Sequence, residues 1–175
     1  LNMMLYYIMN EGLEDKQFIE SRTEGYEDIR AHVMKMDIDE LEKICGVEKE
    51  LVRSAAIAYA SAPNAMSFHG LGVTEHSQGT YTVMLIADLA MITGNIGRRG
   101  VGVNPLRGQN NVQGAADMGC QPHQGAGYLD ITNTAYHHLY EDFYHAKLPL
   151  HAGYKIPQMY DAALNGKLKA LWLMG

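Results

Sequence analysis

The residues from 94 to 115 carry the side chains best suited to bind an anion. This segment holds six glycines and three arginines, together with several side-chain amides, but few aliphatic residues. Such a composition cannot build a core, and the segment is longer than an ordinary connection of about 4–6 residues. Glycines let a backbone approach a ligand closely, while amides and guanidinium groups donate hydrogen bonds to anions. The sequence therefore predicts a loop that wraps a large, polar, negatively charged ligand.

Arg107 is the strongest candidate in this loop for holding a carboxylate or a phosphate. It lies between Pro105 and Gly108, is followed by several amides, and has no acidic residue near it in sequence. A guanidinium presents a rigid fork of donors that matches either anion. An arginine in a solvated loop would have the same neighbours, so the residue types alone leave both interpretations open.

A strand, a glycine-rich turn and a helix precede this loop. Residues 65–68 form a short apolar run that we interpret as a buried parallel strand, and His69-Gly70-Leu71-Gly72 follows it as a turn. A helix is expected over about 78–93, with Gly94 at its C-terminal cap. Ligands of such α/β units bind beyond the carboxyl ends of the strands. The turn from Gly72 to Glu75 is thus a second candidate for phosphate contact, although many such turns need glycine only for their geometry.

The remaining patterns predict mostly helices. The first part of the chain is expected to be helical over 2–9, from Asp15 to Glu20, from Thr23 to Met34, from Asp37 to Gly46, and over 48–61. Residues 125–150 have weak periodicity, a further helix is expected over 155–166, and a strand over 169–174. We expect an α/β chain with a helical N-terminal part, and a change of character near Arg107 suggests a domain boundary.

Composition excludes several classes of function. The formal net charge of −6 argues against a nucleic-acid partner, and no apolar run reaches the roughly 20 residues that span a bilayer. Neither the two cysteines, Cys45 and Cys120, nor the eight histidines have metal-ligand spacing, so we expect no metal site. A cytoplasmic location is the default expectation. The apolar run at each end suggests a fragment of a longer polypeptide.

Three strings of residues resemble the catalytic subunit of molybdenum- or tungsten-dependent formate dehydrogenases, in the molybdopterin oxidoreductase family. They occupy residues 72–76, 89–97 and 102–115. The Thr-Gly-Asn-Ile-Gly string at 93–97 is shared widely across the family, including nitrate reductases. The Asn-Pro-Leu-Arg-Gly-Gln-Asn-Asn-Val-Gln-Gly string at 104–114 is narrower and resembles formate dehydrogenases. The resemblance extends through most of the chain.

This resemblance implies a cofactor and a set of site residues. The full-length chain would bind two molybdopterin guanine dinucleotides that hold Mo or W, and an upstream region would bind a 4Fe-4S cluster. Arg107 would fix the formate carboxylate, with Gln109 close by. The implied cofactor contacts are Leu71, Gly72, Glu75, Gly108 and Gly175. Relatives more often carry Met at position 71 and Gln at position 75, so Glu75 replaces an amide donor with a carboxylate.

The resemblance also implies an architecture and partners. The chain would be a fragment of Rossmann-like, three-layer αβα cofactor-binding domains, with 1–107 as the second half of one molybdopterin-binding domain and 108–175 as the start of the continuing part of a second. Electrons from formate would pass to iron–sulfur clusters and then to iron–sulfur or flavin subunits. The fragment alone would be inactive, because the family's metal-ligating Cys or selenocysteine lies upstream.

Two alternatives stay open at this point. One is a nitrate reductase or another molybdopterin oxidoreductase, against which the string around Arg107 argues. The other is a metal-free structural subunit of a respiratory complex. A chain without the cofactor would have no need for Arg107 and its neighbouring amides, so their presence argues against this second alternative.

Overall fold

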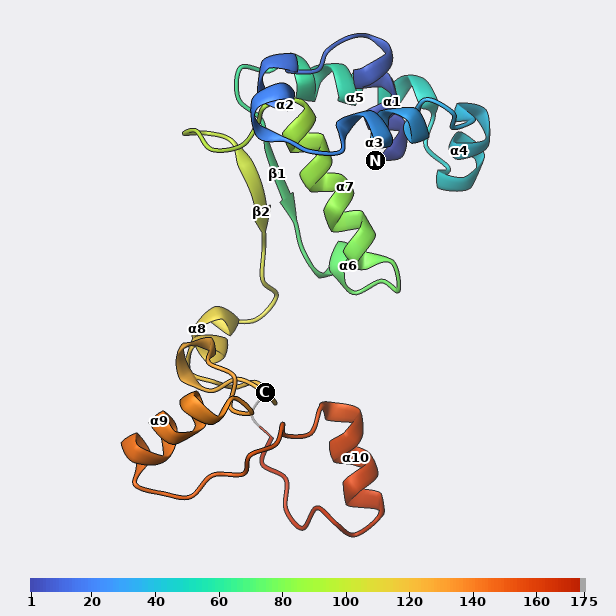
Figure 1. Ribbon diagram of the computed structural model, residues 1–175. Helices are drawn as coiled ribbons and strands as arrows, with labels where there is room; N and C mark the ends of the chain where they lie inside the picture. The colour runs from blue at the N-terminus through green and yellow to red at the C-terminus, as the bar shows by residue number, and fades with distance from the viewer. Residues whose placement is uncertain (174–175) are drawn as a thin grey trace. The chain divides into compact units, whose positions relative to one another are not determined.

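The computed structural model describes residues 1–173, which divide into two compact units (Figure 1). The first unit is Leu1–Gly108, and the second begins at Gln109. The first unit contains α1 (Asn2–Asn10), α2 (Lys16–Arg22), α3 (Tyr26–Val33), α4 (Ile38–Cys45), α5 (Lys49–Ser61), β1 (Met66–His69), α6 (Leu71–Thr74), α7 (Gly79–Ile92) and β2 (Gly102–Pro105). The second contains α8 (Val112–Asp117), a 3₁₀ turn (Ala126–Tyr128), α9 (Thr134–Tyr144) and α10 (Ile156–Leu164). Their assignment to two cofactor-binding domains stays a prediction.

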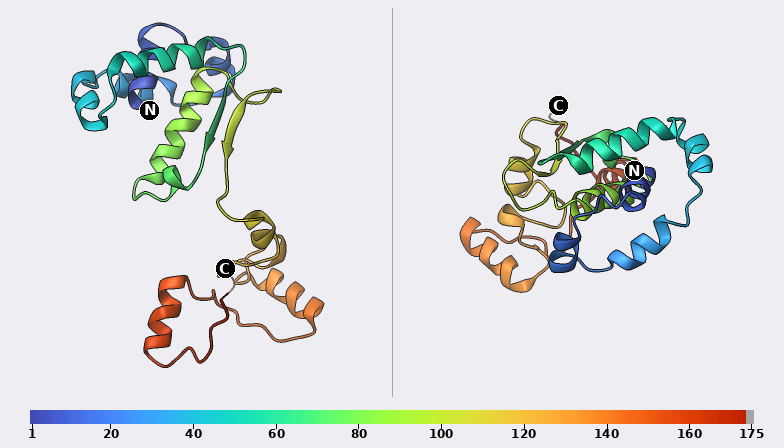
Figure 2. Two further views of the ribbon diagram at one scale, coloured as in Figure 1. Left: turned by 180° about the vertical axis from the view of Figure 1, so that it is seen from behind. Right: turned by 90° about the horizontal axis from the view of Figure 1, so that it is seen from above.

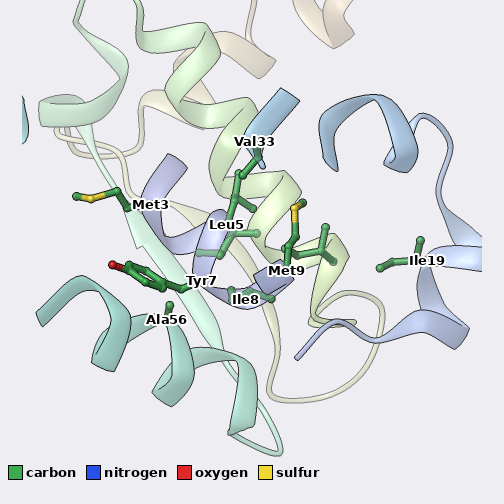
Figure 3. Packing of buried hydrophobic residues seen from close by; sticks show 10 residues of the cluster. Met3, Leu5, Tyr7, Ile8, Met9, Ile19, Val33 and Ala56 are labelled. Atoms are coloured by element: carbon green, nitrogen blue, oxygen red, sulfur yellow. The ribbon is translucent and has the colours of Figure 1, made fainter. Parts of the chain in front are cut away.

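Helix α1 lies at the centre of the first unit's core. Its side chains Leu5 and Ile8 are fully buried and pack with residues from α2, α3, α5 and α7 (Figure 3). Tyr7 lies beside Ala56 of α5, so the aromatic ring fills the space between these two helices. Burial of this apolar surface holds the helical layer against α7. The predicted helical N-terminal part is confirmed.

The sheet of the first unit has two parallel strands. β1 pairs with β2 in a register that places Met66 opposite Gly102 and His69 opposite Pro105. Helix α7 connects the two strands and runs alongside both (Figures 1 and 2). A strand, a helix and a second parallel strand form an α/β unit, so the predicted fold class is confirmed.

Two predictions about these strands are wrong. β1 is not buried on both faces, because Met66 and Phe68 are 44% and 62% exposed in a sheet that is covered on one face only. Residues 102–105 were expected to be irregular, yet they form β2. Its glycine and proline hid the strand from sequence reasoning, and its conformation is fixed by hydrogen bonding to a distant partner strand rather than by local preference.

Local capping signals predicted several helix ends well. The Asp15 side chain accepts a hydrogen bond from Phe18 N at the start of α2, and Asp37 caps α4 in the same way. Thr23 is not an N-cap, because its hydroxyl donates backwards to the last turn of α2. Gly25 occupies the capping position of α3 instead, with a φ of 74° that favours glycine.

The second unit departs further from expectation. Helix α9 lies inside the stretch of weak periodicity, and its N-cap is Asn133, whose side chain accepts from Ala135 N at 3.0 Å. Residues 169–173 form no strand, and positions 174 and 175 lie outside the described residues. Helix α10 (Ile156–Leu164) confirms the helix expected over 155–166.

Two further predictions concern metals and membranes. Glu141 follows His137 by four residues on α9, and its Oε1 atom lies 3.2 Å from His137 Nε2. Even so, residues 1–173 contain no group of three or more His, Cys, Asp or Glu side chains arranged to hold a metal ion. Within the same residues, no helix combines the length and apolar character needed to cross a membrane.

Candidate functional site

The carboxyl ends of β1 and β2 meet at one edge of the sheet. Because the strands are parallel and His69 pairs with Pro105, the turn after β1 and the turn after β2 leave the sheet side by side. Leu106 N donates to the His69 carbonyl at 2.6 Å, which fixes the two turns together. We call this region, made of residues 69–72 and 105–108, the carboxyl edge. It is the position at which open α/β sheets bind ligands.

Gly108 lies directly against Leu71 at this edge. A Cβ atom at position 108 would lie 2.6 Å from Leu71 Cδ1, so any side chain there would displace the leucine. Glycine leaves the backbone of this turn open to close approach. The structure thus brings Leu71, Gly72, Arg107 and Gly108 to one edge, as four of the predicted site residues.

The Arg107 guanidinium is a cation without a protein partner. Its residue is exposed, and it forms no hydrogen bond or ion pair with any residue in the described range 1–173. A guanidinium carries five donors that can match the two oxygens of a carboxylate. The arrangement can therefore take a small anion without first breaking an internal ion pair.

Glu75 ends the short helix that carries Leu71 and Gly72. Its backbone N–H donates to the Leu71 carbonyl at 2.9 Å, which closes the single turn of α6. The carboxylate is exposed and forms no ion pair with Arg107. Glu75 therefore leaves the arginine free, but its own negative charge would repel a phosphate placed close to it.

The amides after Arg107 belong to the second unit, and two of them have structural partners. Asn111 caps α8 in a left-handed conformation with a φ of 51°, and its side chain accepts from Gly114 N at 3.1 Å. Gln113 Nε2 donates to Asp117 Oδ1 at 3.0 Å. These two amides stabilise local structure. The roles of Gln109 near the substrate and of Gly175 near the cofactor stay predictions, the latter because Gly175 lies outside the described residues.

His69 is a residue of the carboxyl edge that sequence reasoning missed. It is 7% exposed, and its Nδ1 atom is buried without a hydrogen-bond partner in the described chain. The sequence singled out the turn that begins at His69, but a single histidine beside a glycine carries no signal about its burial. Only the pairing of β1 with β2 shows where this side chain lies.

A second network, at the opposite edge of the sheet, holds the amino end of β1. The Asn95 side chain is 1% exposed, accepts from Ala65 N at 3.0 Å and donates to Thr93 Oγ1 at 2.9 Å. Arg98 donates to the same asparagine at 3.2 Å and to the Pro63 carbonyl at 2.9 Å. This network joins the end of α7 to the start of β1 and thereby positions β1.

Cavities of ligand size also lie elsewhere in residues 1–173. One, of about 670 Å³, is lined mainly by charged residues of α2 and α3; another, of about 1020 Å³, is lined mainly by apolar residues of the second unit. None of the predicted site residues lines either cavity. Volume alone does not identify a site, and we give more weight to the carboxyl edge because it combines a free cation with open backbone.

Comparison with known proteins decides the family. The model of the family described as molybdopterin oxidoreductase matches residues 1–175. The chain belongs to the molybdopterin oxidoreductase family. This confirms the resemblance seen in the sequence, and the parallel strands that end at His69 and Pro105 are part of a domain of that family.

Three relatives that match the whole chain are formate dehydrogenases by name. The chain is 43% identical to the F420-dependent formate dehydrogenase subunit alpha of Methanocaldococcus jannaschii over 100% of its own length and 26% of that protein. It is 42% identical to formate dehydrogenase H of Escherichia coli over 100% of its own length and 25% of that protein. It is 40% identical to the F420-dependent formate dehydrogenase 2 subunit alpha of Methanococcus maripaludis, over 100% and 26% respectively. The chain thus spans about a quarter of the length of these relatives.

Proposed function

We propose that this chain is part of the catalytic subunit of a formate dehydrogenase that depends on molybdopterin and on Mo or W. The full-length protein oxidises formate to carbon dioxide, or catalyses the reverse reaction. The observation that carries the proposal is the guanidinium of Arg107 at the carboxyl edge, which has no partner among residues 1–173. The names of the relatives, which match over the whole chain, support the same substrate.

The residues of the carboxyl edge fit an anionic dinucleotide. Gly108 leaves room for backbone contact beside Leu71, Gly72 has no other residue within 4 Å of where its Cβ would lie, and Arg107 supplies an unpaired positive charge. We assign Leu71, Gly72, Gly108 and, by resemblance, Gly175 to binding one of two molybdopterin guanine dinucleotides. When bound, the cofactor supplies a metal that accepts two electrons. Glu75 belongs to the same turn, and its carboxylate would have to be directed away from a pyrophosphate bound there.

Arg107 orients the substrate. Two parallel N–H···O hydrogen bonds from Arg107 to the formate oxygens would fix the carboxylate and leave the C–H bond directed away from the arginine. Gln109 adds an amide donor beside the carboxylate. In the proposed reaction, one formate gives one carbon dioxide, one proton and two electrons. Holding formate in one orientation lowers the entropy cost of reaching the reactive geometry.

The electrons leave through groups outside this chain. We propose a 4Fe-4S cluster in the region upstream of Leu1, and iron–sulfur or flavin subunits as electron acceptors. A site without its metal ligand cannot turn over, so the segment 1–175 alone is inactive. A cytoplasmic location is part of this proposal.

Formate-dependent reduction of a dye by the full-length protein, purified without oxygen, tests the function. Turnover with formate, in a preparation that contains Mo or W, is the expected result. Turnover with nitrate but not with formate would instead identify a nitrate reductase. Absence of both turnover and metal would overturn the proposal and favour a structural subunit.

A further inference from the structure

The carboxyl edge contains a buried polar atom without a partner. Within residues 1–173, three buried side-chain atoms lack a hydrogen bond, namely Glu14 Oε2, His69 Nδ1 and His137 Nδ1. Of these, His69 Nδ1 belongs to the carboxyl edge, and the side chain is 7% exposed. Buried polar groups are almost always hydrogen-bonded, because an unsatisfied group loses its water without compensation. An orphaned nitrogen at a ligand-binding edge therefore needs an explanation.

His69 is the last residue of β1 and is hydrogen-bonded to the turn that follows β2. Its carbonyl accepts from Leu106 N at 2.6 Å, and a Cβ on the next residue, Gly70, would lie 3.5 Å from the Leu106 carbonyl oxygen. The backbone of β1 is thus fixed directly before Leu71 and opposite the segment that leads to Arg107. A hydrogen bond made by His69 would act on both turns.

The face of β1 that carries His69 is the covered one. Ser67 lies two residues earlier, on the same face, and its hydroxyl is 3.2 Å from the Tyr59 hydroxyl of α5. Met66 and Phe68, on the other face, are exposed. An apolar side chain at position 69 would bury its surface at this covered position without leaving a polar atom unpaired. Histidine is favourable there only if its nitrogen finds a partner.

We propose that His69 is a further cofactor-binding residue, whose Nδ1–H donates a hydrogen bond to an oxygen of the pyrophosphate of the bound dinucleotide. Because Nδ1 is buried, this contact requires the imidazole ring to rotate about the Cβ–Cγ bond so that Nδ1 faces the ligand. This inference rests on the proposed function, since it needs the dinucleotide at the carboxyl edge. Binding then removes the penalty of the unpaired nitrogen and ties β1 to the ligand.

Three substitutions separate this role from a purely structural one. His69→Leu removes the nitrogen, His69→Asn places an amide near the Nδ1 position, and His69→Gln places an amide near the Nε2 position. Each is made in the full-length protein. Each is produced with the cofactor and also in a host that cannot make molybdopterin.

The expected pattern has opposite signs in the two forms. Without cofactor, His69→Leu should be at least as resistant to unfolding as the wild type, because a buried unpaired atom has been removed. With cofactor, the same variant should lose metal and guanine nucleotide roughly tenfold faster on dilution, since a charge-assisted hydrogen bond is missing. His69→Asn should restore retention, and His69→Gln should not. Retention is measured as Mo or W and guanine nucleotide per chain.

Two other results would overturn the inference. If wild-type protein holds cofactor and oxidises formate while His69→Leu retains the cofactor equally well, His69 has no contact with the dinucleotide although the proposed function stands. If His69→Leu loses stability in the cofactor-free form and His69→Asn does not restore retention, the histidine is structural only. Wild-type protein that holds no guanine nucleotide would overturn both the inference and the proposed function.

Discussion

Replacing Asn95 with leucine should loosen the amino ends of both strands and, through them, the turn that carries Arg107. Asn95 Oδ1 accepts from Ala65 N at 3.0 Å and from Arg98 at 3.2 Å, and Asn95 Nδ2 donates to Thr93 Oγ1 at 2.9 Å. The side chain is 1% exposed. Leucine has the same branching and the same number of side-chain heavy atoms but none of these donors or acceptors, so the substitution removes the network without leaving a large cavity.

The size of the effect follows from the groups left without partners. An unpaired backbone N–H at Ala65 costs about 1–3 kcal/mol, and each of the two other hydrogen bonds contributes about 0.5–1.5 kcal/mol. Ala65 is partly buried and Arg98 is exposed, so hydrogen bonds from water to these groups recover part of the lost free energy. We therefore expect the local stability of β1 to fall by about 2–3 kcal/mol. Because β1 and β2 share one register, the loss should reach both strands.

Hydrogen exchange of the full-length protein measures this loss. Amides of residues 65–69 and 102–106 should exchange roughly 30- to 150-fold faster in Asn95→Leu than in the wild type, if exchange follows local opening. Asn64→Ala is the matched control, because it removes only an exposed contact with Arg98. Exchange in Asn95→Leu that matches the wild type would refute the idea that this network positions the strands.

Two further predictions test the packing of each unit. Gly79→Ala should destabilise the first unit by about 1–3 kcal/mol, because the new Cβ would lie 2.3 Å from the backbone oxygen of Thr74. Gly72→Ala is the control and should not destabilise it, because a Cβ there meets nothing within 4 Å. Equal melting temperatures of the two cofactor-free variants would contradict this prediction. Hydrogen bonds from Lys147 and from Leu148 N lower the pKa of Glu141 to about 2, so the carboxylate should stabilise α9 above its ordinary pKa near 4.5 and lose this contribution as the pH falls toward 2. Amide hydrogen exchange at Leu148, corrected for its intrinsic dependence on pH, should accelerate as the pH falls from 4.5 toward 2. In Glu141→Gln the corrected exchange rate should not change over this pH range.

Local signals account for the parts of the fold that the sequence predicted. Asp37 and Gly46 bracket α4 because a carboxylate caps backbone N–H groups at one end and a left-handed glycine ends the helix at the other. Both effects act within a few residues, so they are readable from sequence. Helix α9 escaped prediction because its tyrosines and histidines form no clear apolar stripe.

Pairing between distant segments accounts for what the sequence did not predict. Strand β2 forms because residues 102–105 pair with β1, and nothing in the Gly-Val-Asn-Pro string predicts a strand. The burial of His69 follows from the same pairing. Arg107 and Leu71 were both singled out beforehand by their residue types and by family resemblance, but only the register of β1 against β2 explains why they belong to one edge.

The account depends most on Arg107 as the group that holds formate, so its conservative replacement is the decisive measurement. Arg107→Lys keeps the positive charge but loses the two-pronged geometry. Since Arg107 has no partner within residues 1–173, no internal contact is lost and the unfolding free energy should change by less than about 0.5 kcal/mol. Arg99→Lys is the matched control, because Arg99 is another exposed arginine without a partner among residues 1–173 and lies in the connection before β2.

Steady-state formate oxidation by the full-length protein gives the answer. Arg107→Lys should lower kcat/KM for formate roughly 10- to 150-fold, the range expected when a hydrogen bond to a charged group is lost, with the metal and nucleotide content unchanged. Arg99→Lys should match the wild type. Equal kcat/KM for Arg107→Lys and wild type, in preparations with equal cofactor content, would contradict the assignment of Arg107 to the formate carboxylate.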